Sequence, residues 1–160
     1  MNKKLRVLID TDVFLIDLRY TRDSKYSENR YFLEQVKKGK LVGWTTVYNL
    51  MEVCGILSFN LNPHRLQELF IGFAAQFNVR VLFPKAKEKD GRVFFIPAEI
   101  LEVMKHKLSF ADALIADIAQ KYSRRLDFFV TWNAVHFKKK LSFKVLTPDE
   151  LPPSPFSLRG

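Results

Sequence analysis

The sequence predicts an α/β domain built around a parallel sheet of about five strands. Short runs of β-branched and aliphatic residues, such as residues 5–9, are typical of strands buried on both faces of such a sheet. These runs alternate with longer segments of helical periodicity, which indicates βαβ units with right-handed crossovers. At 160 residues the chain can bury the core of one domain. We place this domain at residues 1–151 and a Pro-rich tail at residues 152–160.

The strands are expected where short apolar runs are bounded by polar or turn-forming residues. They fall at residues 5–10, 41–45, 79–83, 126–131 and 143–146. Two polar segments are expected outside the regular elements. Residues 21–28 are expected to be a mobile stretch, and residues 85–92 a charged turn or loop.

The helices are expected between these strands, and residues that favour helix ends mark most of their boundaries. The first two are a short helix from Val13 and a helix at 29–38. A long apolar helix ending near Asn62 and Pro63 follows, and then a helix at 66–77 with Pro63 at its start. The last two are a helix at 97–107 and one that runs through Tyr122. Gly39 is expected to stop the second helix, and Thr45 or Thr46 to cap the third. Pro97 and Ser109 mark the beginnings of the last two.

The composition favours a basic protein of the cytoplasm. The net charge is +9, and basic residues cluster at residues 37–40, 85–92, 124–125 and 138–140. Such a surface attracts polyanions such as RNA or DNA, although a surface that is merely well solvated is an equal alternative. Cys54, the single cysteine, cannot form an internal disulfide. No apolar run is long enough to predict a membrane span or a signal peptide.

Two acidic residues follow the first expected strand directly. Asp10 and Asp12 would lie at the carboxyl end of that strand, where ligand sites of open α/β sheets gather. Oxygen ligands of this kind suit Mg²⁺ or Mn²⁺. The alternatives are a helix cap or solvated loop acid for Asp10 and a first-turn helix acid for Asp12, which is the weaker candidate.

Glu52 is the only charged residue between Lys40 and Arg65, in an apolar segment that predicts a mostly buried helix. A buried carboxylate needs a cation, a hydrogen-bond donor or a metal, and we favour the metal over a structural Arg or Lys. Asp112 follows Ser109 by three positions, so it fits a capping box as well as a site facing the sheet. Asp117, about 140° further round the helix, is expected to be a solvent-exposed acid.

Polar residues also follow the fourth expected strand. Asn133 again stands at a strand's carboxyl end, and its alternative role is that of a turn or cap residue. Thr131 is expected to orient a neighbouring carboxylate through its hydroxyl group.

These elements together resemble a PIN domain, the fold of many small metal-dependent ribonucleases that include the toxins of VapBC-type toxin–antitoxin pairs. The matching segments are 7–13, the helical Glu52, 109–116, 130–137 and the ending 145–151. The resemblance implies a three-layer α/β/α fold and assigns metal ligation to Asp10, Glu52 and Asp112, with Asn133 completing the catalytic set. It also implies an RNA substrate, a neutralising antitoxin protein and a homodimer.

The chain departs from the resembled pattern at two positions. Asp12 stands where the family often has Asn and adds a further ligand candidate, while His136 stands where the family often has an acid. His136 is expected to be structural, with phosphate contact or proton transfer as its alternative roles. On this basis we expect hydrolysis of single-stranded or looped RNA, assisted by Mg²⁺ or Mn²⁺.

Two surface features have two open interpretations each. Lys138, Lys139 and Lys140 would contact RNA phosphates or form a solvated run. The aromatic residues of the helix at 66–77 would pack into the core, which we favour, or form a dimer interface. They are Phe70, Phe73 and Phe77.

Two other functions remain open. The Asp10-Thr11-Asp12 start resembles haloacid-dehalogenase-type phosphatases, with Thr45 or Thr46 as the phosphate-binding hydroxyl. Against this, Asp112 stands at a helix start and the chain is short for that family. The third possibility is a catalytically weak PIN-like module that binds RNA or protein, which the His136 departure favours.

Overall fold

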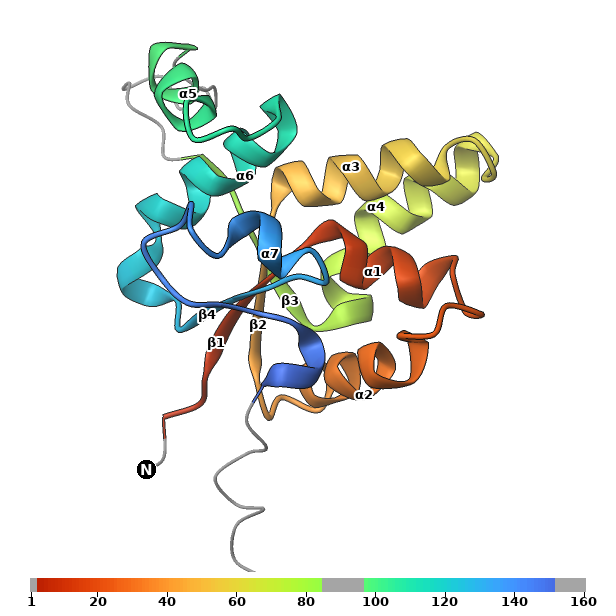
Figure 1. Ribbon diagram of the computed structural model, residues 1–160. Helices are drawn as coiled ribbons and strands as arrows, with labels where there is room; N and C mark the ends of the chain where they lie inside the picture. The colour runs from red at the N-terminus through yellow and green to blue at the C-terminus, as the bar shows by residue number, and fades with distance from the viewer. Residues whose placement is uncertain (1–2, 85–96, 152–160) are drawn as a thin grey trace, which may run out of the picture.

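The computed structural model of the chain describes residues 3–84 and 97–151. Its centre is a sheet of five parallel strands in the order β3-β2-β1-β4-β5 (Figure 1). The strands are β1 (Arg6–Ile9), β2 (Val42–Thr46), β3 (Val79–Leu82), β4 (Phe128–Val130) and β5 (Val145–Leu146). Because all strands run the same way, residues that follow β1, β2 and β4 meet at one edge of the sheet.

Helices cover both faces of the sheet and create the predicted three layers (Figure 1). One face packs against α1 (Thr11–Leu18), α2 (Tyr26–Lys37), α3 (Val47–Leu57) and α4 (Pro63–Phe77). The other packs against α5 (Pro97–Met104), α6 (Phe110–Lys121) and the short α7 (Ala134–Phe137). Two 3-10 turns, Ser123–Arg125 and Pro148–Glu150, complete the described elements. Within them, no helix has the length and apolar character needed to cross a membrane.

Strand β1 shows how the sequence specifies the two layers. Val7 and Ile9 face the core under α1 to α4, while Leu8 between them faces the core under α5 to α7. All three side chains are fully buried, as expected for a central parallel strand with helices on both faces.

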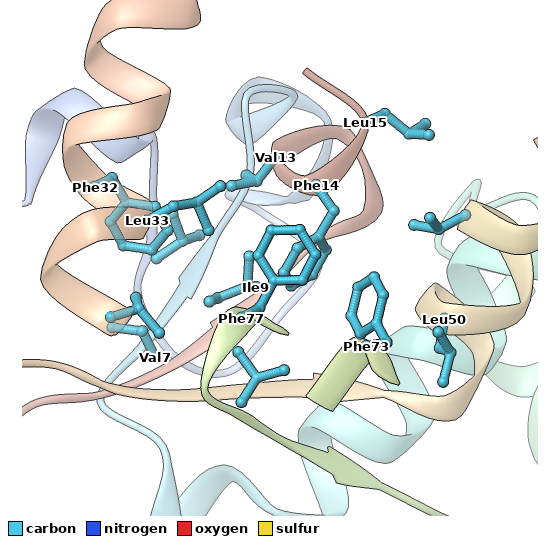
Figure 2. Packing of buried hydrophobic residues seen from close by; sticks show 14 of the residues in the cluster. Val7, Ile9, Val13, Phe14, Leu15, Phe32, Leu33, Leu50, Phe73 and Phe77 are labelled. Carbon is cyan, nitrogen blue, oxygen red and sulfur yellow. The ribbon is translucent and has the colours of Figure 1, made fainter. Parts of the chain in front are cut away.

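Aromatic side chains fill the core beneath α1 and α4 (Figure 2). Phe14 packs edge-on against Phe73 and Phe77, with ring centroids 4.8 and 4.9 Å apart. The expectation of a core role is therefore confirmed for Phe73 and Phe77. It is wrong for Phe70, whose side chain is 45% exposed because it lies on the outer side of the same helix.

Most predicted helix boundaries shift by one to three residues, and the capping residues explain the shifts. Asp10 caps α1, so this helix begins at Thr11 rather than Val13. Thr46 rather than Thr45 caps α3, through a reciprocal capping box with Asn49. Ser109 accepts from the backbone N–H of Asp112 and caps α6 as predicted.

Two expectations about helix extent are wrong. Helix α3 ends at Leu57 and not near Asn62. Asn62 instead caps α4 by accepting from the N–H of Arg65 at 2.9 Å, and Pro63 lies in the first turn of α4. The stretch at 21–28 is not irregular throughout, since α2 already begins at Tyr26. The charged loop expected at 85–92 and the tail at 152–160 lie outside the described residues.

Candidate functional site

Asp10 lies at the carboxyl end of β1, and all of its strong hydrogen-bond donors come from neighbouring elements. Its Oδ1 atom accepts from the N–H of Thr11 at 2.9 Å and from Nδ2 of Asn49 at 3.0 Å. Its Oδ2 atom accepts from the hydroxyl of Thr131 at 2.8 Å. The residue is only 8% exposed. Asp10 is thus both the helix cap that the sequence allowed and a carboxylate held rigidly at the sheet edge.

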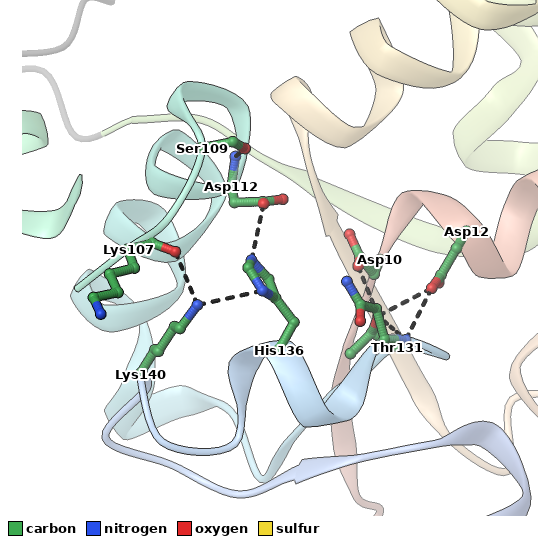
Figure 3. Close-up of polar contacts among 9 residues, drawn as sticks. Asp10, Asp12, Lys107, Ser109, Asp112, Thr131, His136 and Lys140 are labelled. Atoms are coloured by element: carbon green, nitrogen blue, oxygen red, sulfur yellow. Dashed lines mark hydrogen bonds and ion pairs between the residues drawn. The ribbon is translucent and has the colours of Figure 1, made fainter. Parts of the chain in front are cut away.

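Asp12 lies beside Asp10 and receives its donors from the turn after β4 (Figure 3). Its Oδ2 atom accepts from the hydroxyl of Thr131 at 3.1 Å and from the N–H groups of Trp132 and Asn133 at 3.0 and 3.2 Å. Its Oδ1 atom is buried and has no hydrogen-bond partner among the described residues. A buried oxygen without a donor is costly, so this atom is suited to a cation.

The two carboxyl groups share one hydroxyl, and their electrostatics are coupled through it. Thr131 has a single hydroxyl proton but lies within hydrogen-bond distance of both Asp10 and Asp12. Burial, followed by the negative charge of Asp12, raises the pKa of Asp10 to about 7. Burial also raises the pKa of Asp12. Near neutral pH the pair therefore holds a proton or requires a neighbouring positive charge.

Glu52 joins this pair through Thr11 and Asn49. Its Oε2 atom accepts from the hydroxyl of Thr11 at 2.5 Å, and Nδ2 of Asn49 bridges Thr11 and Asp10. The charge of Glu52 contributes to the raised pKa of Asp10, after burial and Asp12. Glu52 itself is partly exposed, because α3 presents one side to solvent instead of being mostly buried as expected.

Asp112 belongs to a second polar group (Figure 3). Its Oδ2 atom lies 3.2 Å from Nε2 of His136, and Nδ1 of His136 lies 3.3 Å from the ammonium of Lys140. Since Lys140 can only donate, Nδ1 accepts and the Nε2–H of His136 donates to Asp112. Lys140 also donates to the carbonyl of Lys107 at 2.9 Å. Asp112 thus accepts from an imidazole that is in turn contacted by the Lys140 ammonium.

The described residues contain no group of three or more His, Cys, Asp or Glu side chains arranged to hold a metal ion. Asp10, Asp12 and Glu52 are linked by hydrogen bonds and charge, while Asp112 is turned toward His136. The oxygen donors and the unpartnered Asp12 oxygen fit a hard cation in kind. Direct ligation would require these side chains to converge further.

The remaining candidates make different contributions. Asn133 gives Asp12 its backbone N–H, and the predicted orienting hydrogen bond of Thr131 is present. The ammonium of Lys138 lies 3.5 Å from a carboxylate oxygen of Glu150. Lys140 contacts His136 and so belongs, with Asp112, to the second polar group, which we call the Asp112 group. Lys139 is exposed. An RNA role for these three lysines stays a prediction.

Sequence reasoning missed two buried asparagines and misplaced one acid. Asn49 orients Asp10, and its only signal was the Thr46-x-x-Asn49 spacing of a capping box. Asn29 accepts from the indole N–H of Trp132 at 2.8 Å, a contact with no sequence signal. Asp117, expected in solvent, is only 9% exposed and pairs with Lys121 at 2.8 Å, because α6 packs that side against α3 and α5.

Comparison with known proteins adds evidence about the fold. No family model matches the sequence, and no curated protein matches it. Solved structures do match over nearly the whole chain. VapBC2 from Rickettsia felis, solved with a fragment of its promoter DNA, is 17% identical with a TM-score of 0.59, covering 89% of this chain and 98% of the other.

Two further solved structures agree. VapBC-1 from nontypeable Haemophilus influenzae is 13% identical with a TM-score of 0.61, covering 91% of this chain and 100% of the other. FitAcB from Neisseria gonorrhoeae is 18% identical with a TM-score of 0.59, covering 91% and 99%. At these identities the likeness is one of fold. The chain therefore has an α/β PIN-like fold, with seven helices and a five-stranded parallel sheet among its described residues.

Proposed function

We propose that the protein is a metal-dependent endoribonuclease that hydrolyses RNA phosphodiester bonds and acts as the toxin of a VapBC-type toxin–antitoxin pair. The observation that carries this proposal is the Asp10–Asp12 pair. Asp10 is buried and shares the Thr131 hydroxyl with Asp12, the pKa of Asp10 is raised to about 7, and one buried Asp12 oxygen has no donor among the described residues. Such an arrangement is stable near neutral pH only with a proton or a cation.

Mg²⁺ or Mn²⁺ is the cation that suits these oxygen donors. Asp10, Asp12 and Glu52 would hold it, and Asp112 would join them after release from His136. When bound, the ion would polarise the scissile phosphate and lower the pKa of an attacking water. Thr131, Asn49 and the N–H groups of Trp132 and Asn133 fix the orientation of the acids before substrate arrives.

The partners of the structural neighbours support the toxin role. Their solved structures are VapBC and FitAB-type complexes, some bound to DNA fragments. We infer that this chain likewise has an antitoxin partner, which would place an arginine against the Asp10–Asp12 pair. Formation of a homodimer, the use of RNA as substrate and action in the cytoplasm are parts of the same proposal.

A specific observation favours one other function, a catalytically weak PIN-like module. Asp112 is held by His136 and Lys140, and the described residues hold no ready three-ligand group. The phosphatase alternative has less support. Thr45 donates to the carbonyl of Ile9 and Thr46 caps α3, and both are fully buried, so neither hydroxyl is placed to receive a phosphate.

Cleavage of a labelled structured RNA in the presence of Mg²⁺ or Mn²⁺ tests the nuclease proposal. Wild type should cleave, and Asp10→Asn and Glu52→Gln should not. Glu68→Gln, which changes an exposed acid that pairs with His64, is the matched control and should cleave like wild type. Absence of cleavage by wild type, together with no thermal stabilisation by Mn²⁺, would instead support the weak binding module. Turnover of a chromogenic phosphomonoester would support the phosphatase.

A further inference from the structure

A hollow of about 380 Å³ lies directly beside the Asp10–Asp12 pair and has no role in the proposed chemistry. Asp12 forms part of its wall, with Tyr20, Asp23, Lys25, Trp132 and Asn133. We call it the Trp132 hollow. Its volume falls within the range of sites that bind small organic groups. A second hollow, of about 310 Å³, continues from it along residues 19–23 and shares Tyr20 and Asp23.

Trp132 is a fixed aromatic surface rather than a loose side chain. Its indole N–H donates to Asn29 at 2.8 Å, and Asn29 is fully buried and itself donates to the carbonyl of Val13 at 2.9 Å. The backbone N–H of the same residue donates to Asp12. One residue therefore connects the carboxylate to the wall of the hollow, and both are held by buried hydrogen bonds.

Cations lie over aromatic rings along the segment that borders the hollow. The ammonium of Lys25 lies 5.2 Å from the Trp132 ring centroid, and the guanidinium of Arg19 lies 5.4 Å from that of Tyr20. Further along, Arg30 lies 5.9 Å from the ring of Tyr26. Alternating basic and aromatic side chains are the usual surface for single-stranded nucleic acid, because bases stack on the rings and phosphates pair with the cations.

We propose that the Trp132 hollow binds one base of single-stranded RNA, which takes the place of the Lys25 ammonium over the indole. Lys25 then pairs with the adjoining phosphate, and Tyr20 holds the next nucleotide. This inference rests on the proposed nuclease function and specifies how its substrate is held. A base on Trp132 sets the neighbouring phosphate next to Asp12. Duplex RNA does not fit, because its base faces are covered by stacking.

The lining of the hollow favours a nucleotide over a peptide anchor. Leu15 and Ile16 give the hollow apolar walls, and Lys25 and Asn133 add charged and amide groups. A base matches both, because it has an apolar face and a polar edge, whereas an apolar peptide side chain matches only the walls. The inference also moves the main RNA contact away from the lysine run at 138–140. Two of those lysines are already engaged, Lys138 with Glu150 and Lys140 with His136.

Binding of RNA without cleavage tests the inference. The full chain carrying Asp10→Asn is titrated in chelator against a fluorescein-labelled single-stranded oligouridylate of about twelve nucleotides. Adding Trp132→Ala should weaken binding roughly tenfold or more, since stacking on an aromatic ring contributes strongly per base. Lys25→Ala should weaken it by a smaller factor. It should also lower the slope of log affinity against log salt concentration by about 0.7, the value for one phosphate contact on a single strand.

Lys144→Ala is the matched control, because its ammonium lies 5.8 Å from the Phe128 ring at the opposite end of the strands. It should bind within about twofold of its parent. Thermal denaturation checks that each variant folds. Should Trp132→Ala fail to fold, Tyr20→Ala, which changes a side chain that is 44% exposed, carries the test with Lys25→Ala.

The inference would be overturned if Trp132→Ala and Lys25→Ala bound the RNA as tightly as the Asp10→Asn parent. It would also be overturned if Lys144→Ala lost as much RNA affinity as they do. Loss of a protein partner with unchanged RNA affinity would assign the hollow to that partner instead. The outcome is separable from that of the nuclease proposal. If Asp10→Asn cleaves like wild type, the nuclease proposal fails, whereas Trp132-dependent binding is measured without any cleavage.

Discussion

The Asp10–Asp12 pair and the Asp112 group lie on opposite sides of the same sheet edge, and they stabilise their charges differently. Asp10 is 8% exposed and shares the Thr131 hydroxyl with Asp12, and within residues 3–84 and 97–151 no lysine, arginine or histidine is hydrogen-bonded to either. The side chain of Asp112 is 30% exposed and is paired through His136 with Lys140. The same kind of residue thus needs a proton or a cation in one region and has a histidine backed by a lysine in the other.

This difference indicates where a divalent ion has the larger effect. At the Asp10–Asp12 pair it would remove a buried repulsion, so binding it and folding the site are coupled. At Asp112 it would have to displace an existing partner. We therefore expect the first region to dominate metal binding and the second to tune it.

Removal of the Asp10 carboxylate should have the largest effect on activity. Asp10→Asn is expected to reduce RNA cleavage by on the order of a hundredfold or more, since even residues that merely orient metal ligands have effects of this size. The folded state should not suffer, because the amide removes a buried repulsion. Cleavage rates measured with Mn²⁺, and melting temperatures measured at pH 8 without divalent ions, check the two parts. A variant that cleaves normally would remove Asp10 from the reaction.

The stability of the protein without divalent ions should fall as the pH rises from about 4 to about 7. The folded-state pKa of Asp10, about 7, lies above its ordinary value of 3.8. Between these values the native state keeps a proton that the unfolded state has released, so raising the pH through 7 favours unfolding. The expected loss is a few kcal/mol, at about 1.4 kcal/mol per pKa unit. Urea denaturation across this range measures it, and Asp10→Asn should flatten the profile.

Thr131→Val should separate orientation from packing. The substitution removes the hydroxyl that lowers the pKa of both Asp10 and Asp12, and it should cost about 1–3 kcal/mol of stability. Thr45→Val is the matched control, because the Thr45 hydroxyl is equally buried but donates to the Ile9 carbonyl. Both variants should lose stability, and only Thr131→Val should lose cleavage, by roughly 10- to 100-fold. Equal activity of the two would contradict the orienting role.

Lys140→Ala should have the smallest effect on stability. The group that it belongs to is partly exposed, so its loss should change the free energy of unfolding by less than about 1 kcal/mol. Without the Lys140 ammonium, the negative charge of Asp112 would be less compensated, so the affinity of Asp112 for Mn²⁺ should rise. Calorimetric titration of Mn²⁺ into both proteins measures the change. A weaker affinity in the variant would show that Lys140 supports the site rather than competing with the ion.

The architecture was largely accessible from the sequence because it depends on short-range signals. The apolar run at 5–9 and the Thr46 and Ser109 caps act within a few residues, so their positions could be inferred. The end of α3 was missed because the Asn62-Pro63 pair, taken as the end of one helix, is the start of the next.

The chemistry of the site was less accessible, because it depends on contacts between residues far apart in the chain. The sequence indicated Asp10, Glu52 and Asp112, but it could not show that Asp112 turns toward His136, a contact across 24 positions. It also ranked Asp12 below Asp10, although Asp12 receives three donors from a turn about 120 positions away.

The most direct test of this account is thermal denaturation at pH 8 with and without Mn²⁺, for wild type and Asp10→Asn. If the buried pair lacks a cation, saturating Mn²⁺ should stabilise wild type by about 2.7 kcal/mol at a hundredfold excess over the dissociation constant. The variant should gain much less. Equal stabilisation of both proteins, or of neither, would contradict the claim that the Asp10–Asp12 pair is built to receive a divalent ion.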